Sequence, residues 1–133
     1  MTLHDPKSDP LSDFLAQRTF AVVGVSRDPS KWGTVVYRDL KAKGYRVFPV
    51  NPKMSELGGD AVFPSLAALP EPVDGVVIVT PPAVTEQVVR EAHGAGISRV
   101  WMQEGAESET ALQLCEELGI AAVHGVCVII RSR

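Results

Sequence analysis

The sequence has little cysteine, no long apolar run and no excess of positive charge. Only two of its 133 residues are cysteines, Cys115 and Cys127, which is too few for a disulfide framework and lacks the spacing of a zinc site. No apolar stretch approaches the ~20 residues that a membrane-spanning helix requires. The formal net charge of -3 provides no general attraction to a nucleic acid backbone. We therefore expect a cytoplasmic protein with reduced thiols that binds neither membranes nor nucleic acids.

The N-terminus also lacks the apolar core of a secretory signal peptide. Its first ten residues, MTLHDPKSDP, are mostly polar or charged. We expect residues 1–10 to form a mobile tail. A chain of this length suits one hydrophobic core, so residues 11–133 are expected to form one domain.

What the chain does contain is a regular alternation of apolar runs and helical patterns. In one of the helical patterns, Val84, Val88 and Ala92 follow each other at i, i+4 and i+8, which predicts a buried helix face. Such alternation favours parallel strands joined by right-handed crossovers. The expected fold class is α/β, a single doubly wound domain with a mainly parallel sheet of about five strands and helices on both faces. The expected strands cover 19–24, 45–52, 75–80, 97–105 and the run that begins at Ile120.

The other helices are expected from their termini. A short leading helix should cover residues 11–17, with Ser12 as its cap. The helix that follows Trp32 should end at Gly44. Segment 57–70 is expected to be an irregular connection that holds one short helix.

In doubly wound sheets, ligands lie outside the carboxyl ends of the strands, where the strand order reverses. The residues at and just beyond the carboxyl ends of four expected strands are therefore the candidate cofactor-binding residues. They are Gly24, Ser26, Arg27, Asp28, Pro29, Lys31, Val50, Asn51, Pro52, Lys53, Thr80, Pro81, Pro82, Met102, Gln103 and Glu104.

The loop after the first strand favours an anion. Gly24 lets the backbone approach a phosphate, the following helix offers free N–H groups, and Arg27 and Lys31 add cations. The alternative is a solvated surface loop in which Gly33 serves packing. The loop is neither a GxGxxG motif nor a Walker A loop, so it does not by itself name the nucleotide.

The end of the second strand argues against NAD. An NAD site would place Asp or Glu there to bind the ribose hydroxyls. Here the strand ends in Val50-Asn51-Pro52-Lys53, and a lysine suits a phosphorylated ribose, or is a solvated charge after a turn. NADP and coenzyme A both remain compatible with this pattern.

The remaining candidates allow two interpretations each. Pro81 and Pro82 would form a flat apolar wall against a ligand, or simply a strand-to-helix turn. Glu104 would accept a hydrogen bond from a ligand or cap the helix that begins near Ser108. Cys127, near His124, would be a nucleophile or, as we favour, a small core residue. A binding site is therefore indicated more clearly than a reaction.

Three stretches together resemble a known family. They are "VVGVSRDPSKWGTVVYRDLKAKGYRVFPVNP", "VTPPA" and "WMQEGAESE". The chain from about residue 11 to residue 131 resembles the small stand-alone CoA-binding domain proteins, which are similar to the N-terminal CoA-binding domain of the succinyl-CoA synthetase α subunit. The resemblance implies a Rossmann-like domain that binds coenzyme A or acyl-CoA. By this analogy 26–29 would hold phosphates, 50–53 would lie along the 3′-phospho-ADP part, 80–82 would flank the nucleotide or the pantetheine arm, and 102–104 would match the synthetase's Thr-Glu-Gly-type loop.

The departures from the synthetase limit what the resemblance implies. The synthetase carries its phosphorylated histidine in a second domain, for which this sequence has no counterpart, and its Pro-Asn-Cys-Pro run is replaced here by Gly-Val-Cys-Val around Cys127. We therefore expect a non-catalytic coenzyme A-binding protein: a carrier, a sensor, or a partner of an acyl-CoA enzyme, with homo-oligomers as another form of partnership. The alternative is an NADP-dependent oxidoreductase or another small nucleotide-using enzyme, which would need a proton donor beside the cofactor. A third hypothesis is an interaction module whose ligand pocket is lost.

Overall fold

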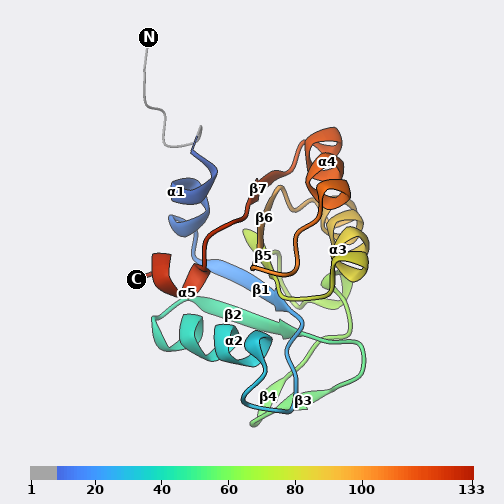
Figure 1. The fold of residues 1–133 in the computed structure, drawn as a ribbon. Coiled ribbons are helices and arrows are strands. Elements are labelled where there is room, and N and C mark those ends of the chain that lie inside the picture. The colour runs from blue at the N-terminus through green and yellow to red at the C-terminus, as the bar shows by residue number, and fades with distance from the viewer. Residues whose placement is uncertain (1–8) are drawn as a thin grey trace.

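The central feature of the fold is a five-stranded sheet with helices on both faces (Figure 1). The computed structural model describes residues 9–133, and residues 1–8 of the expected tail lie outside the described part of the chain. The sheet strands are β1 (Thr19–Val23), β2 (Arg46–Val50), β5 (Gly75–Ile78), β6 (Arg99–Met102) and β7 (Ala121–Val123). The α-helices are α1 (Pro10–Leu15), α2 (Trp32–Ala42), α3 (Pro82–Gly94), α4 (Glu109–Leu118) and α5 (Val128–Arg131). The predicted α/β class is confirmed.

All neighbouring strands of this sheet are parallel, in the order β2-β1-β5-β6-β7. The chain first steps outward from β1 to β2 and then crosses back to place β5 on the other side of β1. This reversal makes the carboxyl ends of β1 and β5 the switch point of the sheet. It is the place where doubly wound folds bind their ligands.

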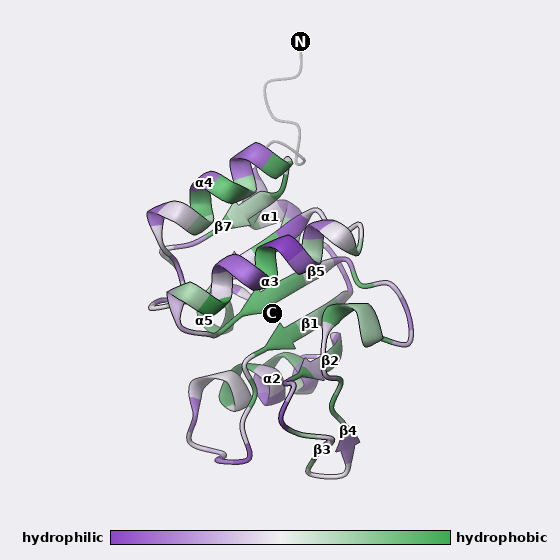
Figure 2. Cartoon of the chain, turned by 90° about the vertical axis from the view of Figure 1, so that its right-hand side faces the viewer, coloured by the Kyte–Doolittle hydropathy of each residue, from purple (hydrophilic) through white to green (hydrophobic). Residues whose placement is uncertain are grey.

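Alternation along each strand divides the core into two layers. In β1, Phe20 and Val22 face one layer while Ala21 and Val23 face the other. Residues of α1, α2 and α5 belong to the first layer, and residues of α3 and α4 to the second, as the two groups of helices in Figure 1 show. Figure 2 shows the same arrangement by hydropathy, with apolar strands β1 and β5 beside helices that carry polar residues.

The leading helix packs through one aromatic residue. The Phe14 ring stacks on Phe20 at 4.8 Å between centroids and meets Trp101 edge-on at 5.4 Å. Gly75 leaves room for this ring, because a Cβ there would lie 2.6 Å from Phe14 Cε2. The α1 helix begins at Pro10, inside the expected tail.

Two details of the expected helices were wrong. The cap of α1 is Asp9, whose carboxylate accepts the Leu11 N–H at 3.1 Å and the Ser12 hydroxyl at 2.7 Å. On α3, Val88 and Ala92 are buried as predicted, but Val84 is 43% exposed and the buried stripe includes Thr85 and Val89 instead. Val84 lies in the first turn of α3, where Pro82 and Ala83 are exposed as well, and burial begins at Thr85.

The connection after β2 contains a small hairpin that was not expected from the sequence. Strands β3 (Glu56–Leu57) and β4 (Asp60–Ala61) pair antiparallel around Gly58 and Gly59, both with positive φ. The Gly-Gly pair was the available signal, since it favours a two-residue hairpin turn. Strands of two residues are too short to show an alternating pattern. The expected short helix is the 3₁₀ turn η2 (Leu66–Ala68).

Candidate ligand-binding site

Two glycines shape the loop between β1 and α2. Gly24 has a φ of 113°, and a Cβ there would lie 2.0 Å from the Val79 carbonyl oxygen beyond the end of β5. A Cβ on Gly33 would lie 2.1 Å from the Gly24 carbonyl oxygen. The start of α2 is therefore pressed directly onto the end of β1, which brings its N-terminus to the switch point.

The same loop is ordered by its own side chains. Buried Thr34 accepts the Ser26 N–H at 2.8 Å and donates to the Ser26 carbonyl at 2.6 Å. The Asp28 carboxylate accepts the hydroxyl of Ser30 at 2.7 Å and its N–H at 2.9 Å, and these bonds hold the pKa of Asp28 below its ordinary value. The N–H of Ser26 is thus already used.

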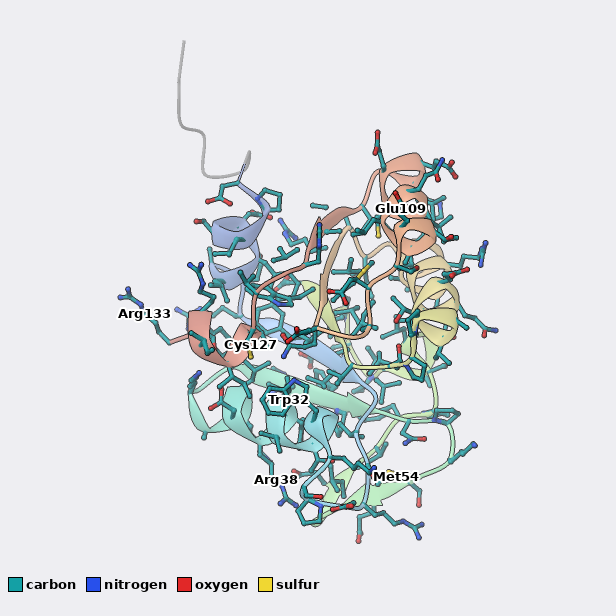
Figure 3. All side chains as sticks on the ribbon, viewed as in Figure 1. Trp32, Arg38, Met54, Glu109, Cys127 and Arg133 are labelled. Carbon is teal, nitrogen blue, oxygen red and sulfur yellow. The ribbon has the colours of Figure 1, made fainter. Side chains whose placement is uncertain are left out.

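Further N–H groups and an aromatic side chain lie at the start of α2. Trp32 and Gly33 occupy the first two helical positions, so their N–H groups have no acceptor inside the helix. The Trp32 side chain, labelled in Figure 3, is exposed at this same edge. Trp32 was given no role from the sequence, although an exposed tryptophan beside Lys31 offers a flat surface to a ligand.

The cations of this edge have no ion-pair partners within residues 9–133. Arg27, Lys31 and Lys53 are all exposed, and none forms a salt bridge with a described carboxylate. Elsewhere in the described chain, ion pairs hold Lys41, Lys43, Arg46 and Arg99. The free cations lie beside the free N–H groups, an arrangement that suits a polyanionic ligand.

The end of β2 divides into structural and exposed positions. Val50 is buried in the core. The Asn51 amide donates to the Val25 carbonyl at 2.7 Å and accepts the Lys53 N–H at 2.8 Å, so it ties β2 to the loop after β1. Pro52 and Lys53 are exposed and remain available to a ligand.

The prolines after β5 lie at the same edge. Pro81 caps α3, Pro82 is its first residue, and both are exposed. Thr80 and Thr85 join their hydroxyls at 2.8 Å beneath them. The strand-to-helix turn and the apolar wall weighed from the sequence are therefore compatible.

The structure does not bring the side chains of Met102 and Gln103 to the surface of this edge. They are 0% and 1% exposed. Gln103 Oε1 accepts the Val128 N–H at 2.8 Å, and Gln103 Nε2 donates to Cys127 Sγ at 3.4 Å. Gln103 therefore holds the C-terminal segment, while Met102 belongs to the core layer of α3 and α4. Glu104 is exposed, and Ser108 rather than Glu104 caps α4.

His124 and Cys127 were weighed from the sequence as a base and a nucleophile. In the described chain, Cys127 has Gln103 as its hydrogen-bond partner, and no hydrogen bond joins it to exposed His124. No group of three His, Cys, Asp or Glu side chains suited to a metal ion occurs in residues 9–133.

One residue pair that was overlooked in the sequence is a Tyr-x-x-x-Lys motif in α2. Tyr37 donates its hydroxyl to Asp60 Oδ2 at 2.7 Å, and Lys41 Nζ lies 2.6 Å from the same oxygen. Burial and the bond to Asp60 raise the pKa of Tyr37. The tyrosine therefore keeps its proton and anchors the β3–β4 hairpin to α2, and it does not suit proton transfer to a cofactor.

This anchor predicts a pH-dependent loss of stability in Tyr37→Phe. The bonds from Lys41 and Tyr37 hold the pKa of Asp60 below its ordinary 3.8. A group with a lowered folded-state pKa stabilises the fold above its ordinary pKa, and that contribution disappears as the pH falls through the lowered value. We expect the variant to lose about 1 kcal/mol at pH 7, since Asp60 is partly exposed, and much less in strong acid. Urea unfolding at several pH values measures this.

The matched control is Tyr45→Phe. Within the described residues, no hydrogen bond involves the Tyr45 hydroxyl, while its ring packs on Phe20 at 5.2 Å. An equal loss in both variants, or a Tyr37→Phe loss that does not change with pH, contradicts the anchor.

Two hollows in the surface lie at different distances from the predicted strand-end residues. An apolar hollow of about 740 Å³ lies between η2 and the end of α3, lined among others by Leu69, Pro70 and Gly94. It lies away from the predicted residues. A polar hollow of about 540 Å³ adjoins the loop after β1 and is lined among others by Arg27 and Arg38.

Comparison with known proteins decides the family. The profile described as "CoA binding domain" matches residues 18–133. The chain belongs to this CoA-binding domain family. A solved structure of a conserved hypothetical protein from Pyrococcus furiosus is 40% identical, with a TM-score of 0.83 over 86% of this chain and 99% of that one. The uncharacterized protein YneT of Bacillus subtilis is 26% identical over 95% of this chain and 94% of its own length.

A longer relative also matches this CoA-binding domain protein. It is the α subunit of an ADP-forming acetate–CoA ligase (II) of Pyrococcus furiosus, which is 30% identical over 89% of this chain. The chain spans 28% of the length of that subunit. Within residues 9–133, no helix has the length and apolarity needed to cross a membrane. The resemblance to CoA-binding domains that was drawn from the sequence is confirmed.

Proposed function

We propose that this protein binds coenzyme A or an acyl-CoA, without transforming it, at the carboxyl edge of β1, β2 and β5. One observation carries the proposal: Arg27, Lys31 and Lys53 lie without ion-pair partners among the described residues, beside the N-terminus of α2, at the switch point of the sheet. Coenzyme A brings a pyrophosphate and a ribose phosphate, and so it needs several cations and N–H donors. Membership of the CoA-binding domain family supports the same ligand.

The proposed arrangement follows the groups that remain exposed. The pyrophosphate takes the N–H groups of Trp32 and Gly33 and the cations of the loop after β1. The pantetheine arm runs along Pro81 and Pro82, toward exposed Glu104. The proposed binding surface rests on four predicted residues that do not themselves face the ligand: Val50, Asn51, Met102 and Gln103.

The exposed cations and the free N–H groups at the start of α2 support a binding role. A carrier or sensor needs only to hold the thioester, and an enzyme partner would supply the reaction. The matched relative named as an acetate–CoA ligase subunit is consistent with a partner that uses acyl-CoA. A second copy of this chain is the other partner that we expect.

Removing the positive charge of Arg27 or of Lys53 is expected to weaken coenzyme A binding. Arg27→Ala and Lys53→Ala should each cost about 1–3 kcal/mol of binding free energy, the range for a hydrogen bond to a charged group. Isothermal titration calorimetry with coenzyme A measures the change. Arg90→Ala is the matched control, because Arg90 is exposed on α3 and forms no ion pair among the described residues. Unchanged affinity in both site variants would show that the phosphates lie elsewhere.

The NADP alternative is tested on the same protein. The free lysine at the end of β2 would also suit a 2′-phosphate, so NADPH is titrated beside coenzyme A, with tryptophan fluorescence quenching as the readout. Tighter binding of NADPH, or turnover of a carbonyl substrate with it, would replace the coenzyme A proposal. A protein whose thermal midpoint no nucleotide shifts would instead be an interaction module.

A further inference from the structure

We propose that the polar hollow between the loop after β1, α2 and the β3–β4 hairpin binds the ribose 3′-phosphate of coenzyme A, with Arg38 as its principal cation. The inference rests on the proposed function and extends it to residues outside the predicted set. The hollow has a volume of about 540 Å³, which is ample for a phosphate group and part of its ribose. Its lining residues are Arg27, Arg38, Ser55, Glu56, Leu57 and Gly58.

The position of Arg38 separates it from the pyrophosphate. It lies six residues after the start of α2, about 9 Å along the helix axis. Figure 3 places it on the side of α2 that faces the hairpin. A Cβ on Gly58 would lie 3.5 Å from Arg38 Nη2, so the guanidinium rests beside the hairpin turn.

The charges around Arg38 leave its donors free. The neighbouring Asp60 carboxylate is already held by Lys41 and Tyr37, and Arg38 forms no salt bridge within the described chain. Glu56, exposed at the rim, is the carboxylate among the lining residues and opposes an anion. The Arg38 guanidinium offsets the charge of Glu56, and its planar geometry matches phosphate oxygens. Arg27, which binds the pyrophosphate in the proposed arrangement, also lines this hollow and adds to its positive potential.

The hairpin wall is fixed before any ligand arrives. Asp60 ties it to α2, and the Val62 N–H donates to the Ser55 carbonyl at 3.0 Å. The following Phe63 bridges to Val50 at the end of β2. A preformed wall spares a ligand the cost of ordering it.

The position of the hollow, beside the end of β2, favours the ribose phosphate over the pyrophosphate as its occupant. In doubly wound folds that bind dinucleotides, the ribose lies near the end of the second strand, where a nearby arginine accommodates the 2′-phosphate of NADP. Here β2 leads directly into the hairpin, and Arg38 faces that turn. A cofactor that carries a phosphate on its ribose is therefore preferred over the same cofactor without it.

The test is a thermodynamic cycle that combines the removal of the Arg38 guanidinium with the removal of the 3′-phosphate from the ligand. Calorimetry measures the affinities of the parent and Arg38→Gln for coenzyme A and for dephospho-coenzyme A. We expect the parent to prefer coenzyme A, and Arg38→Gln to weaken coenzyme A about tenfold to a hundredfold while dephospho-coenzyme A changes less than about threefold. Ser55→Asp, which adds a negative charge to the same hollow, should reduce the preference in the same way, and Arg90→Gln should leave it intact.

Each result has a distinct meaning. If the parent binds coenzyme A but loses both ligands equally in Arg38→Gln, or never distinguishes them, the 3′-phosphate lies elsewhere and the proposed function survives. If the parent binds neither ligand, the proposed function and this inference fall together. Circular dichroism checks that the variants fold. We expect them to fold, because Arg38, Ser55 and Arg90 are all exposed.

Discussion

Gly24→Ala is expected to lower the free energy of unfolding by about 3–5 kcal/mol, the largest effect that we predict for one added methyl group. A φ of 113° lies outside the range that a residue with a Cβ adopts readily, and that Cβ would stand 2.0 Å from the Val79 carbonyl oxygen. Both backbones are held by hydrogen bonds to the sheet: the Gly24 N–H donates to the Val50 carbonyl at 3.1 Å, and the Val79 N–H donates to the Val23 carbonyl at 2.9 Å. Urea unfolding measures the change.

Gly33→Ala gives the same test without the unusual φ. Its Cβ would lie 2.1 Å from the Gly24 carbonyl oxygen, so the start of α2 must move away from β1. The control is Gly94→Ala, because Gly94 ends α3 with an ordinary φ, and a methyl group added there would meet no atom within 4 Å. It should be neutral or stabilise by up to about 1 kcal/mol. If the three variants have the same free energy of unfolding, the loop, the strand and the helix do not approach each other as closely as described.

Gln103→Ala is expected to lower the free energy of unfolding by about 2–4 kcal/mol. The substitution opens a cavity at a fully buried position and leaves the buried Val128 N–H without its acceptor. Gln103→Met keeps most of the volume and isolates the lost hydrogen bond, at about 1–3 kcal/mol. Gln113→Ala, at an exposed position of α4, should change stability by less than about 0.5 kcal/mol.

The release of the C-terminal segment gives Gln103→Ala a second readout. Half-buried Cys127 loses its amide partner, so we expect it to react faster with a thiol reagent. Cys115 is the internal reference, because burial raises its pKa to about 11 and keeps it unreactive while the domain is folded. Equal acceleration at both thiols would indicate global unfolding instead, and no acceleration at Cys127 would show that Gln103 does not hold this segment.

The position of a residue along the strands could be predicted from the sequence, but the orientation of its side chain could not. Strand ends can be found from apolar runs and glycines, and the structure places Arg27, Lys53 and Pro82 after strands that end at the same edge of the sheet. The orientation of each side chain there depends on neighbours that a local pattern does not contain. Gln103 follows β6 as Glu104 does, yet its side chain is buried because its amide bonds to the segment around Val128. Met102 is the last residue of β6 and is buried in the core layer of α3 and α4.

The β3–β4 hairpin brings together residues whose roles could not be predicted from the sequence. Arg38 carries no motif, and its relation to Gly58 arises because Asp60 ties two segments together across 23 residues of chain. The Tyr-x-x-x-Lys sequence would suggest proton transfer if it were taken alone. Only the contact with Asp60 shows that Tyr37 is an anchor.

The sequence by itself determined the α/β class and the order of the five sheet strands along the chain, because apolar periodicity and glycine-ended strands are local properties of the chain. The family followed from the resemblance of three stretches of the sequence. The tertiary structure decided which strand-end side chains face solvent, which of the described cations lack partners, and where the hairpin closes beside α2. Those outcomes depend on contacts between residues far apart in the chain, and burial and charge pairing are set only when these residues meet.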